Sequence, residues 1–447
     1  MAVGPARLLV VVAALASVLA AAGCGPGASG ADPDGVAAVG TGDDAGASPA
    51  ATADAGGDQA TPAAYPAVAP DAPSVVSAGG AVLAAPRIVP VFFPGETDEA
   101  TFIDLITRYV ASPVWTAAVS EYGVGAATVA PAVHVTDALP ASLTSGQLGA
   151  WIAAHLDGSH PDWGSNDDAV IASSVYLLYP PSGVTLYAPG EDPTDPSAVT
   201  LCSRTWDLFG WHWQTTPAPG PAPAIAYGVV GRCAAGGTPL LEGMTATTTH
   251  ELVEAVTDPL FVTAPAWSSV DASHLIWMEL TGGGELGDLC AFDSADLVTP
   301  PGLGHVVQRT WSNAAAAAGH DPCVPAVAPA YVNAVADAPD EFYDPYAGTR
   351  VHGLAIPHGQ SRTVDVHLFS DVPTAPWRVT AVDPLASGGQ EPLLDFSLDR
   401  ATGSNGDVLH LTIRPRSLQP NLTALYEIDS TLDGVTQRWF GEIVVTP

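Results

Sequence analysis

The sequence predicts an α/β domain, with a mixed sheet and helices, followed by an all-β, Ig-like sandwich domain. Between residues 87 and 257, apolar runs with strand character alternate with amphipathic helical segments. After residue 325, short runs alternate apolar and polar residues between clusters of Gly, Pro and Asp. A hydrophobic content of 47% with 11 Trp excludes a chain that is disordered throughout.

Residues 1–23 are predicted to be a signal peptide. Arg7 precedes an apolar run at residues 8–22, which at about fifteen residues is too short to span a bilayer comfortably. The run ends in LAAAGC, which is similar to a bacterial lipoprotein cleavage box with Cys24 as the lipidated residue. Ordinary secretion with an incidental cysteine is the alternative. We expect an exported bacterial lipoprotein, in the outer membrane, the periplasm or at the cell surface, that contacts the membrane through Cys24.

Residues 24–78 are predicted to be a lipidated, disordered tether. They consist almost entirely of Ala, Gly, Pro, Asp, Ser and Thr, and such a segment cannot bury enough apolar surface to order itself. The whole chain carries 47 acidic against 13 basic residues, a formal net charge of −34. Nucleic acid is therefore excluded as a partner, because binding it requires clustered cations.

Four cysteines follow Cys24, an even number that indicates two disulfides in an exported chain. Three pairings are open, and sequence order favours Cys202 with Cys233 and Cys290 with Cys323. Each bridge would close a loop of about thirty residues and contribute about 3 to 4 kcal/mol. A thiolate metal site is the alternative, but the chain has no CxxC spacing to support it.

The α/β domain is expected to span residues 79–325. Apolar residues at Phe102, Leu105, Ile106 and Tyr109 have helical spacing. Strands are predicted where Val, Ile, Tyr and Leu are dense. The expected strands are at residues 87–93, 128–135, 169–179 and 225–230, and the expected helices are at residues 97–110 and 145–156.

The candidate metal-binding and catalytic residues lie in the run HELVE at residues 250–254. His250 and Glu254 are four residues apart and would share one face of a helix, which Pro259 ends near residue 257. In HExxH zinc enzymes, ligands at this spacing hold the metal while the intervening Glu, here Glu251, handles a proton. Zinc accepts a carboxylate ligand, although other divalent ions are also compatible. The alternative is a helix with two solvated acids and an interfacial His.

A third metal ligand is expected from residues 279–290, where three acids surround a glycine-rich turn beside Cys290. Asp288 is the first choice, with Glu285 and then Glu279 as alternates. Ordinary turn chemistry is the competing interpretation, since Gly-Asp pairs are common in turns.

Several short motifs follow one another in a fixed order. They are YLL at 176–178, the stretch 202–212, YGVVG at 227–231, HELVE at 250–254, DP at 258–259, AW at 266–267, ELGDLC at 285–290 and VVQRTWS at 306–312. In this order they resemble the Exordium-like, or phosphate-induced, family of secreted proteins, over roughly residues 86–324.

The resemblance implies export and a zincin-like frame around the HELxE helix, and in plants an association with the cell wall and growth. It implies no defined reaction. Family members often have Asn in place of Asp258, so Asp258 is expected to end the helix rather than bind metal. The His of the aromatic loop corresponds to His212, a possible lining residue of the site. Its alternative role is a half-buried His between Trp211 and Trp213.

Residues 326–447 are expected to form the β-sandwich as an accessory domain for binding or spacing. Two functions remain open for the whole chain. The first is a zinc-dependent, peptidase-like hydrolase that acts on a peptide or cell-surface polymer, with ligands His250, Glu254 and Asp288 and general base Glu251. The second is a catalytically inactive protein, on the same frame, that binds at the cell surface or associates with the cell wall.

Overall fold

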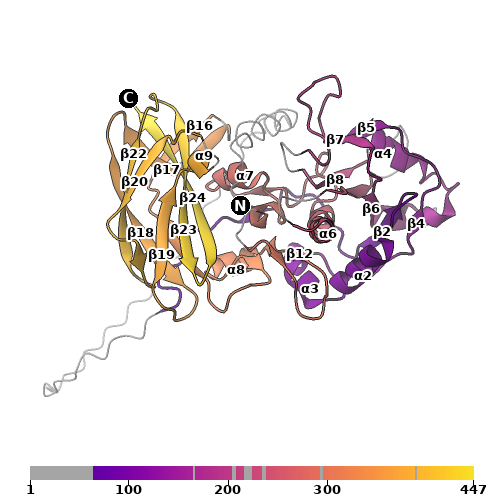
Figure 1. The fold of residues 1–447 in the computed structure, drawn as a ribbon, viewed down its shortest axis with the longest axis horizontal. Coiled ribbons are helices and arrows are strands. Elements are labelled where there is room, and N and C mark those ends of the chain that lie inside the picture. Colours follow the sequence, from indigo (N-terminus) through magenta and orange to yellow (C-terminus); the bar gives the residue numbers. More distant parts are fainter. Residues whose placement is uncertain are drawn as a thin grey trace, which may run out of the picture.

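The computed structural model describes residues 64–164, 167–203, 208–215, 224–233, 238–291, 295–345, 347–387 and 390–447. The expected signal peptide, Cys24 and the first part of the expected tether lie outside these residues. The described residues form an α/β region and a two-sheet β-sandwich that lie side by side (Figure 1). The predicted mixture of helices with a large share of β-strand is therefore confirmed.

A six-stranded sheet forms the centre of the α/β region. Its strands are β2 (Arg87–Phe92), β3 (Thr128–Val129), β4 (Val133–His134), β6 (Ser174–Tyr179), β8 (Gly210–Gln214) and β9 (Ala226–Val230). The order is β3-β2-β6-β9-β8, and β4 also pairs with β2. All pairs are parallel except β8 with β9, so the edge strand β8 runs antiparallel. β2, β6 and β9 are almost fully buried, which explains their continuous apolar composition.

Helices cover both faces of this sheet. Phe102 and Leu105 of α2 join one buried cluster with Leu252 of α6, whereas Leu148 and Ile152 of α4 belong to a second cluster. The α/β elements up to the long helix are α2 (Glu99–Val110), α3 (Pro113–Val119), η1 (Ser120–Tyr122), β5 (Ser142–Thr144), α4 (Ser145–Ala154), η2 (Pro161–Trp163), α5 (Asp168–Ala172), β7 (Thr185–Tyr187) and α6 (Leu240–Thr257). Among the described residues, no helix combines the length and the apolar composition needed to cross a membrane.

Two sequence-based boundaries are corrected by the structure. The expected strand at 169–179 begins as helix α5, because the Asp167 side chain accepts a hydrogen bond from the backbone N–H of Ala169 and caps it. The expected tether also ends earlier than residue 78. Val75 in strand β1 (Val75–Val76) is buried and pairs with Val270 in β10 (Ser269–Val270), because it completes a small antiparallel pair against the folded body.

Helix α6 is buried along most of its length, although it is rich in polar residues. Four of its threonines donate their hydroxyl groups to carbonyls of the same helix. Thr248 Oγ1 donates to the Met244 carbonyl at 2.8 Å, and Thr257 Oγ1 donates to the Val253 carbonyl at 2.9 Å. The helix can therefore enter the core and carry ionisable side chains into it.

Short elements follow α6, and one of them brings the chain back into contact with this helix. They are α7 (Ile276–Thr281), η3 (Asp288–Cys290), β11 (Leu297–Val298), β12 (Val307–Gln308), β13 (Thr310–Trp311), α8 (Asn313–Ala317) and β14 (Cys323–Val324). β11 pairs with β12, and β13 pairs with β14. β12 packs directly against α6, so residues more than fifty positions apart meet there.

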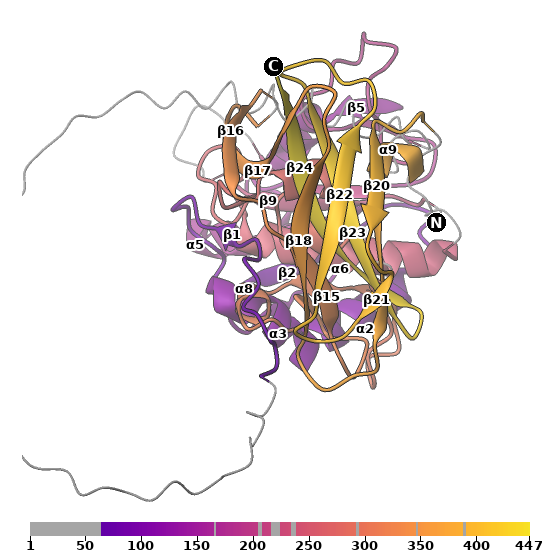
Figure 2. The ribbon, with the colours of Figure 1, turned by 90° about the vertical axis from the view of Figure 1, so that its left-hand side faces the viewer.

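The two sheets of the β-sandwich follow. One contains β15 (Val332–Ala336), β18 (Arg362–Ser370), β22 (Val408–Pro415) and β20 (Leu394–Leu398) in that order. The other contains β16 (Asp340–Asp344), β17 (Thr349–Pro357), β24 (Val435–Thr446), β23 (Thr423–Leu432), β19 (Trp377–Val382) and β21 (Thr402–Gly403). The short helix α9 (Pro384–Ser387) follows β19. The four-stranded sheet is the outer layer, and the six-stranded sheet faces the α/β region (Figure 2).

Aromatic packing joins the sandwich to the α/β region. Trp277 of α7 lies edge-on to Trp439 and Phe440 of β24, with ring centroids 5.6 and 4.8 Å apart. The same indole contacts Trp311 of β13 at 5.8 Å. Helix α7 leads directly into the loop that carries Glu285 and Asp288. By packing against Trp277 of α7, the sandwich therefore supports the start of that loop.

The cysteine pairing predicted from sequence order is confirmed. Cys202 bonds Cys233, with Cα atoms 5.2 Å apart, and Cys290 bonds Cys323, with Cα atoms 5.8 Å apart. The chain segment that the first bridge closes contains β8 and β9, and the second bridge links η3 to β14. Both bridges therefore hold elements that pack near α6.

Removing the second bridge should destabilise the protein. For the Cys290→Ala/Cys323→Ala double variant, we expect the free energy of unfolding to fall by about 3 to 4 kcal/mol, because an opened loop of this length gains conformational entropy in the unfolded chain. Urea unfolding of the full chain measures this loss. The Cys202→Ala/Cys233→Ala variant is the matched control and should lose a similar amount, since the sequence separations are 31 and 33 residues. A loss below about 1 kcal/mol would contradict the expectation.

Candidate metal centre

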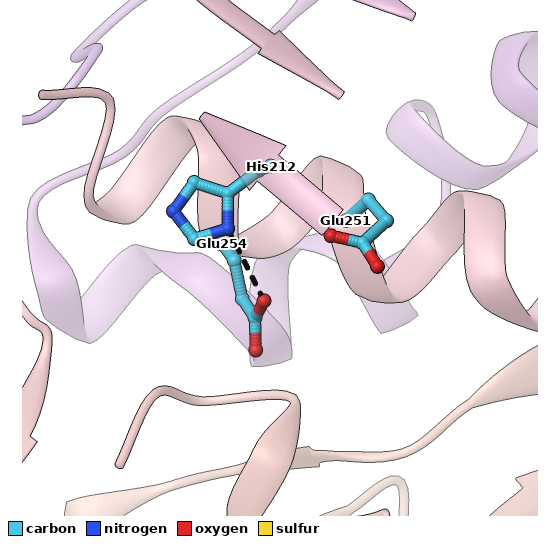
Figure 3. Close-up of side chains that lie close together, drawn as sticks. All are labelled: His212, Glu251 and Glu254. Atoms are coloured by element: carbon cyan, nitrogen blue, oxygen red, sulfur yellow. Dashed lines mark ion pairs between the residues drawn. The ribbon is translucent and has the colours of Figure 1, made fainter. Parts of the chain in front are cut away.

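Ionisable side chains from three separate parts of the chain meet beside α6. Helix α6 contributes His250, Glu251 and Glu254, the edge strand β8 contributes His212, and the loop after α7 contributes Glu285 and Asp288. These six residues line a cavity of about 190 Å³. Figure 3 shows His212 beside the helix from which Glu251 and Glu254 extend.

His250, Glu254 and Asp288 form a group whose ligand atoms all lie within 4.8 Å of one another. His250 Nε2 is 3.2 Å from Glu254 Oε2 and 3.7 Å from Asp288 Oδ1. Ligand atoms at zinc distances in a tetrahedron are about 3.3 to 3.6 Å apart. The three side chains therefore have a spacing that fits one divalent cation.

Gln308 fixes the orientation of the His250 ring. His250 Nδ1 donates to Gln308 Oε1 at 3.0 Å, and Gln308 Nε2 donates to the Gly287 carbonyl at 2.7 Å. The backbone N–H of Gln308 donates to Thr249 Oγ1 at 3.1 Å. With the Nδ1 proton held in this way, Nε2 is the ring nitrogen that faces Glu254 and Asp288. In the neutral ring, Nε2 carries the lone pair that a metal-binding His requires.

The loop approaches α6 so closely that only glycine fits at position 287. A Cβ atom there would lie 2.6 Å from His250 Nδ1 and 2.7 Å from Glu254 Oε1. The backbone N–H of Gly287 instead donates to Glu254 Oε1 at 3.2 Å. This bond holds one carboxylate oxygen of Glu254 and leaves the other facing the His side chains.

Glu251 is 4% exposed and lines the cavity beside these ligands. It forms a second close group with His212 and Glu254, again within 4.8 Å. Among the described residues, its Oε2 atom has no hydrogen-bond partner. Its carboxyl group is thus placed to exchange a proton with a small molecule in the cavity.

Burial and neighbouring charges shift the pKa values of the ionisable groups in the site. Burial, reinforced by the charge of Glu254, raises the pKa of Glu251 to about 8 and that of Asp288 to about 7. Burial alone would lower the pKa of His250, but the charge and hydrogen bond of Glu254 outweigh it and raise the pKa well above its usual value. For Glu254, burial is outweighed by the His250 charge and by hydrogen bonds to both His rings, so its pKa is lowered.

The structure brings most predicted residues together and separates one. His212 is 6% exposed, more deeply buried than expected, and its Nδ1 atom lies 3.4 Å from Glu254 Oε2. Glu285 also reaches the site, 3.4 Å from His212 Nε2. Glu279 lines neither the cavity nor any of the three close groups of possible ligands among the described residues. It lies on α7, where burial and the charge of Asp344 in the sandwich raise its pKa to about 7.

No role was predicted for Gln308, and no role in the site was predicted for Asp258. Gln308 belongs to the motif VVQRTWS, which was the only available signal. Asp258 ends α6, as expected, and its Oδ1 accepts the backbone N–H of Ala266 at 2.7 Å. The structure also places Asp258 within 4.8 Å of His212 and Glu285.

Comparisons with known proteins add no functional information. No family model matches the chain, and no curated protein matches it. Among solved structures, the titin M3 domain has 15% identity and a TM-score of 0.15, over 21% of this chain and 88% of that chain. A Bacteroides ovatus GH5 xyloglucanase has 10% identity and a TM-score of 0.14, over 21% of this chain and 17% of that chain. Scores this low carry no conclusion.

The metal-free protein should lose stability as the pH rises. Glu251 and Asp288 have folded-state pKa values of about 8 and about 7, above their ordinary values, so the folded chain binds more protons than the unfolded chain. The raised pKa of His250 acts in the same direction. After chelation, we expect the melting temperature to fall by a few degrees between pH 5 and pH 8.

A divalent cation should reverse this trend, because it binds deprotonated ligands and competes with protons. Added Zn²⁺ is expected to raise the melting temperature more at pH 8 than at pH 5. The Glu251→Gln/Asp288→Asn variant serves as the control and should show a flatter pH profile without metal. A metal-free profile that rises steadily from pH 5 to pH 8 would contradict the assignment.

Proposed function

We propose that this chain is a metal-dependent hydrolase with peptidase-like activity, and that zinc is its metal. The observation that carries the proposal is the convergence of His250, Glu254 and Asp288 at zinc-compatible spacing, with Glu251 beside them on the same helix. Catalytic zinc sites commonly use three protein ligands and leave one position open. The cavity in front of the ligands provides that space.

Each residue has a distinct role in this proposal. A divalent cation held there would polarise a substrate carbonyl and lower the pKa of water. His250, Glu254 and Asp288 hold the cation, and Gln308 orients His250. Glu251 takes a proton from the attacking water and delivers it to the leaving amine nitrogen as the C–N bond breaks.

The surroundings favour an extended peptide as the substrate. Trp211, Trp213 and Phe261 give the cavity apolar walls, and the rings of Trp213 and Phe261 lie 5.5 Å apart. Among the described residues, β8 pairs with β9 on one edge only. A substrate peptide that paired with the other edge of β8 would bind beside the ligands through β-augmentation.

We extend the proposal to the fold family of the α/β region, the type of the sandwich and the export of the chain. A mixed sheet packed against an HExxE helix supports the zincin-like frame. The motif order supports membership in the Exordium-like family, and the mostly antiparallel pairing of the two C-terminal sheets supports an Ig-like sandwich. The two disulfides support export to an oxidising compartment. The run LAAAGC supports Cys24 as the lipid anchor.

Substitutions within one helix turn separate an enzyme from an inactive binding protein. Glu251→Gln should retain bound Zn²⁺ and the fold but cleave peptides about 10² to 10⁴ times more slowly, the usual contribution of a general base. His250→Ala should lose both metal and activity. Peptide-library cleavage and metal analysis of the full chain measure these effects.

The matched control is Glu242→Gln, an exposed Glu on the same helix, which should leave both properties unchanged. If the wild type binds no divalent metal at micromolar concentration, the hydrolase proposal fails. It also fails if the wild type and Glu251→Gln cleave peptides equally. The inactive surface-binding protein then takes its place.

The anchor can be tested separately from the site. Cys24→Ala should move the exported protein from the membrane fraction to the soluble fraction without lowering its melting temperature. Membrane fractionation with detection of the attached lipid measures this. A variant that remains on the membrane would place the anchor elsewhere.

A further inference from the structure

Among the described residues, a second set of side chains beside the proposed zinc ligands each has one buried polar atom without a hydrogen-bond partner. His212, Asp258 and Glu285 place one ligand atom each within 4.8 Å of the others. Within the described part of the chain, His212 Nε2, Asp258 Oδ2 and Glu285 Oε1 are all buried atoms with no hydrogen bond. His212 Nε2 and Glu285 Oε1 face each other at 3.4 Å.

The other polar atoms of two of these side chains are already engaged. His212 Nδ1 lies 3.4 Å from Glu254 Oε2, and Asp258 Oδ1 accepts the backbone N–H of Ala266 at 2.7 Å. A proton on His212 Nδ1 leaves the lone pair of Nε2 directed at the two carboxyl groups. The atoms without partners on His212 and Asp258 are therefore fixed in direction.

Burial makes this arrangement costly unless something binds there. His212, Asp258 and Glu285 are 6%, 0% and 8% exposed, so water does not compensate them as it would at the surface. One imidazole nitrogen and two carboxylate oxygens are ordinary ligands of divalent transition cations. A single cation would satisfy all three atoms.

The negative formal charge of the site also favours a bound cation. Five carboxyl groups surround the two His rings, and the described residues that line the cavity include no Lys or Arg. One divalent cation at His250, Glu254 and Asp288 leaves most of this negative charge uncompensated. The second group shares no residue with the first, so both can be occupied together.

We propose that His212, Asp258 and Glu285 form a second site for a divalent transition cation, of the zinc or manganese type, next to the site at His250. The contact between His212 and Glu254 joins the two sites. The second cation holds the edge strand β8 and the loop at Glu285 against the end of α6. This inference concerns metal stoichiometry and does not require hydrolysis.

Metal stoichiometry of the full chain tests the proposal. The protein is stripped with a chelator, titrated with Zn²⁺ or Mn²⁺ alone by calorimetry, and then analysed for bound metal. We expect two ions per wild-type chain. Asp258→Asn and Glu285→Gln should each weaken one of the two sites by at least about 100-fold and leave the other within about tenfold. Asp288→Asn should weaken the opposite site, so Asp258→Asn/Asp288→Asn should bind no ion tightly.

The alternative occupant is a proton, which would make His212 an imidazolium paired with its two acids. One ion per wild-type chain, with no change in Asp258→Asn or Glu285→Gln, would establish this alternative and overturn the proposal. If Asp258→Asn fails to fold, wild type and Glu285→Gln decide the question. Two bound ions without peptide cleavage would contradict the proposed function but not the second site.

Discussion

Burial of ionisable side chains on α6 is the constraint on which the rest of the structure depends. His250, Glu251 and Glu254 lie on a helix that is almost entirely inside the protein, where an uncompensated charge is costly. The helix contributes the acids and one His, so compensation must come from its neighbours. His212, Gln308 and the backbone N–H of Gly287 provide part of it through direct contacts.

The elements that provide these contacts are each held in place. One disulfide encloses the strand that carries His212, and the other joins η3, which begins at Asp288, to β14. The β-sandwich adds a third support through the packing of Trp277 on β24. Candidate ligands on a helix, on a cross-linked pair of strands and on a supported loop are held in place before binding, which would lower the cost of binding a cation.

This organisation explains why two close groups of candidate ligands can exist in one small cavity. The helix face alone gives a pair of ligands four residues apart, and the loop adds Asp288. Once the loop and β8 are both fixed against the helix, Glu285 and His212 also meet, together with Asp258 at the helix end. The chain is acidic overall, and its carboxyl groups are especially dense in this cavity. Cations or protons must compensate their negative charge there.

The sequence by itself determined much of the local structure. Apolar spacing predicted α2, a helix was also expected where α4 lies, strand composition predicted most of the central sheet, and the order of the cysteines predicted both bridges. The i, i+4 spacing of His250 and Glu254 predicted their shared face, because helix geometry is local. Only the tertiary structure decided that Asp288 and Glu285 reach the site whereas Glu279 faces the sandwich. Those outcomes depend on the path of the loop after α7 and on its contacts with distant strands, which the spacing of residues along the chain does not encode.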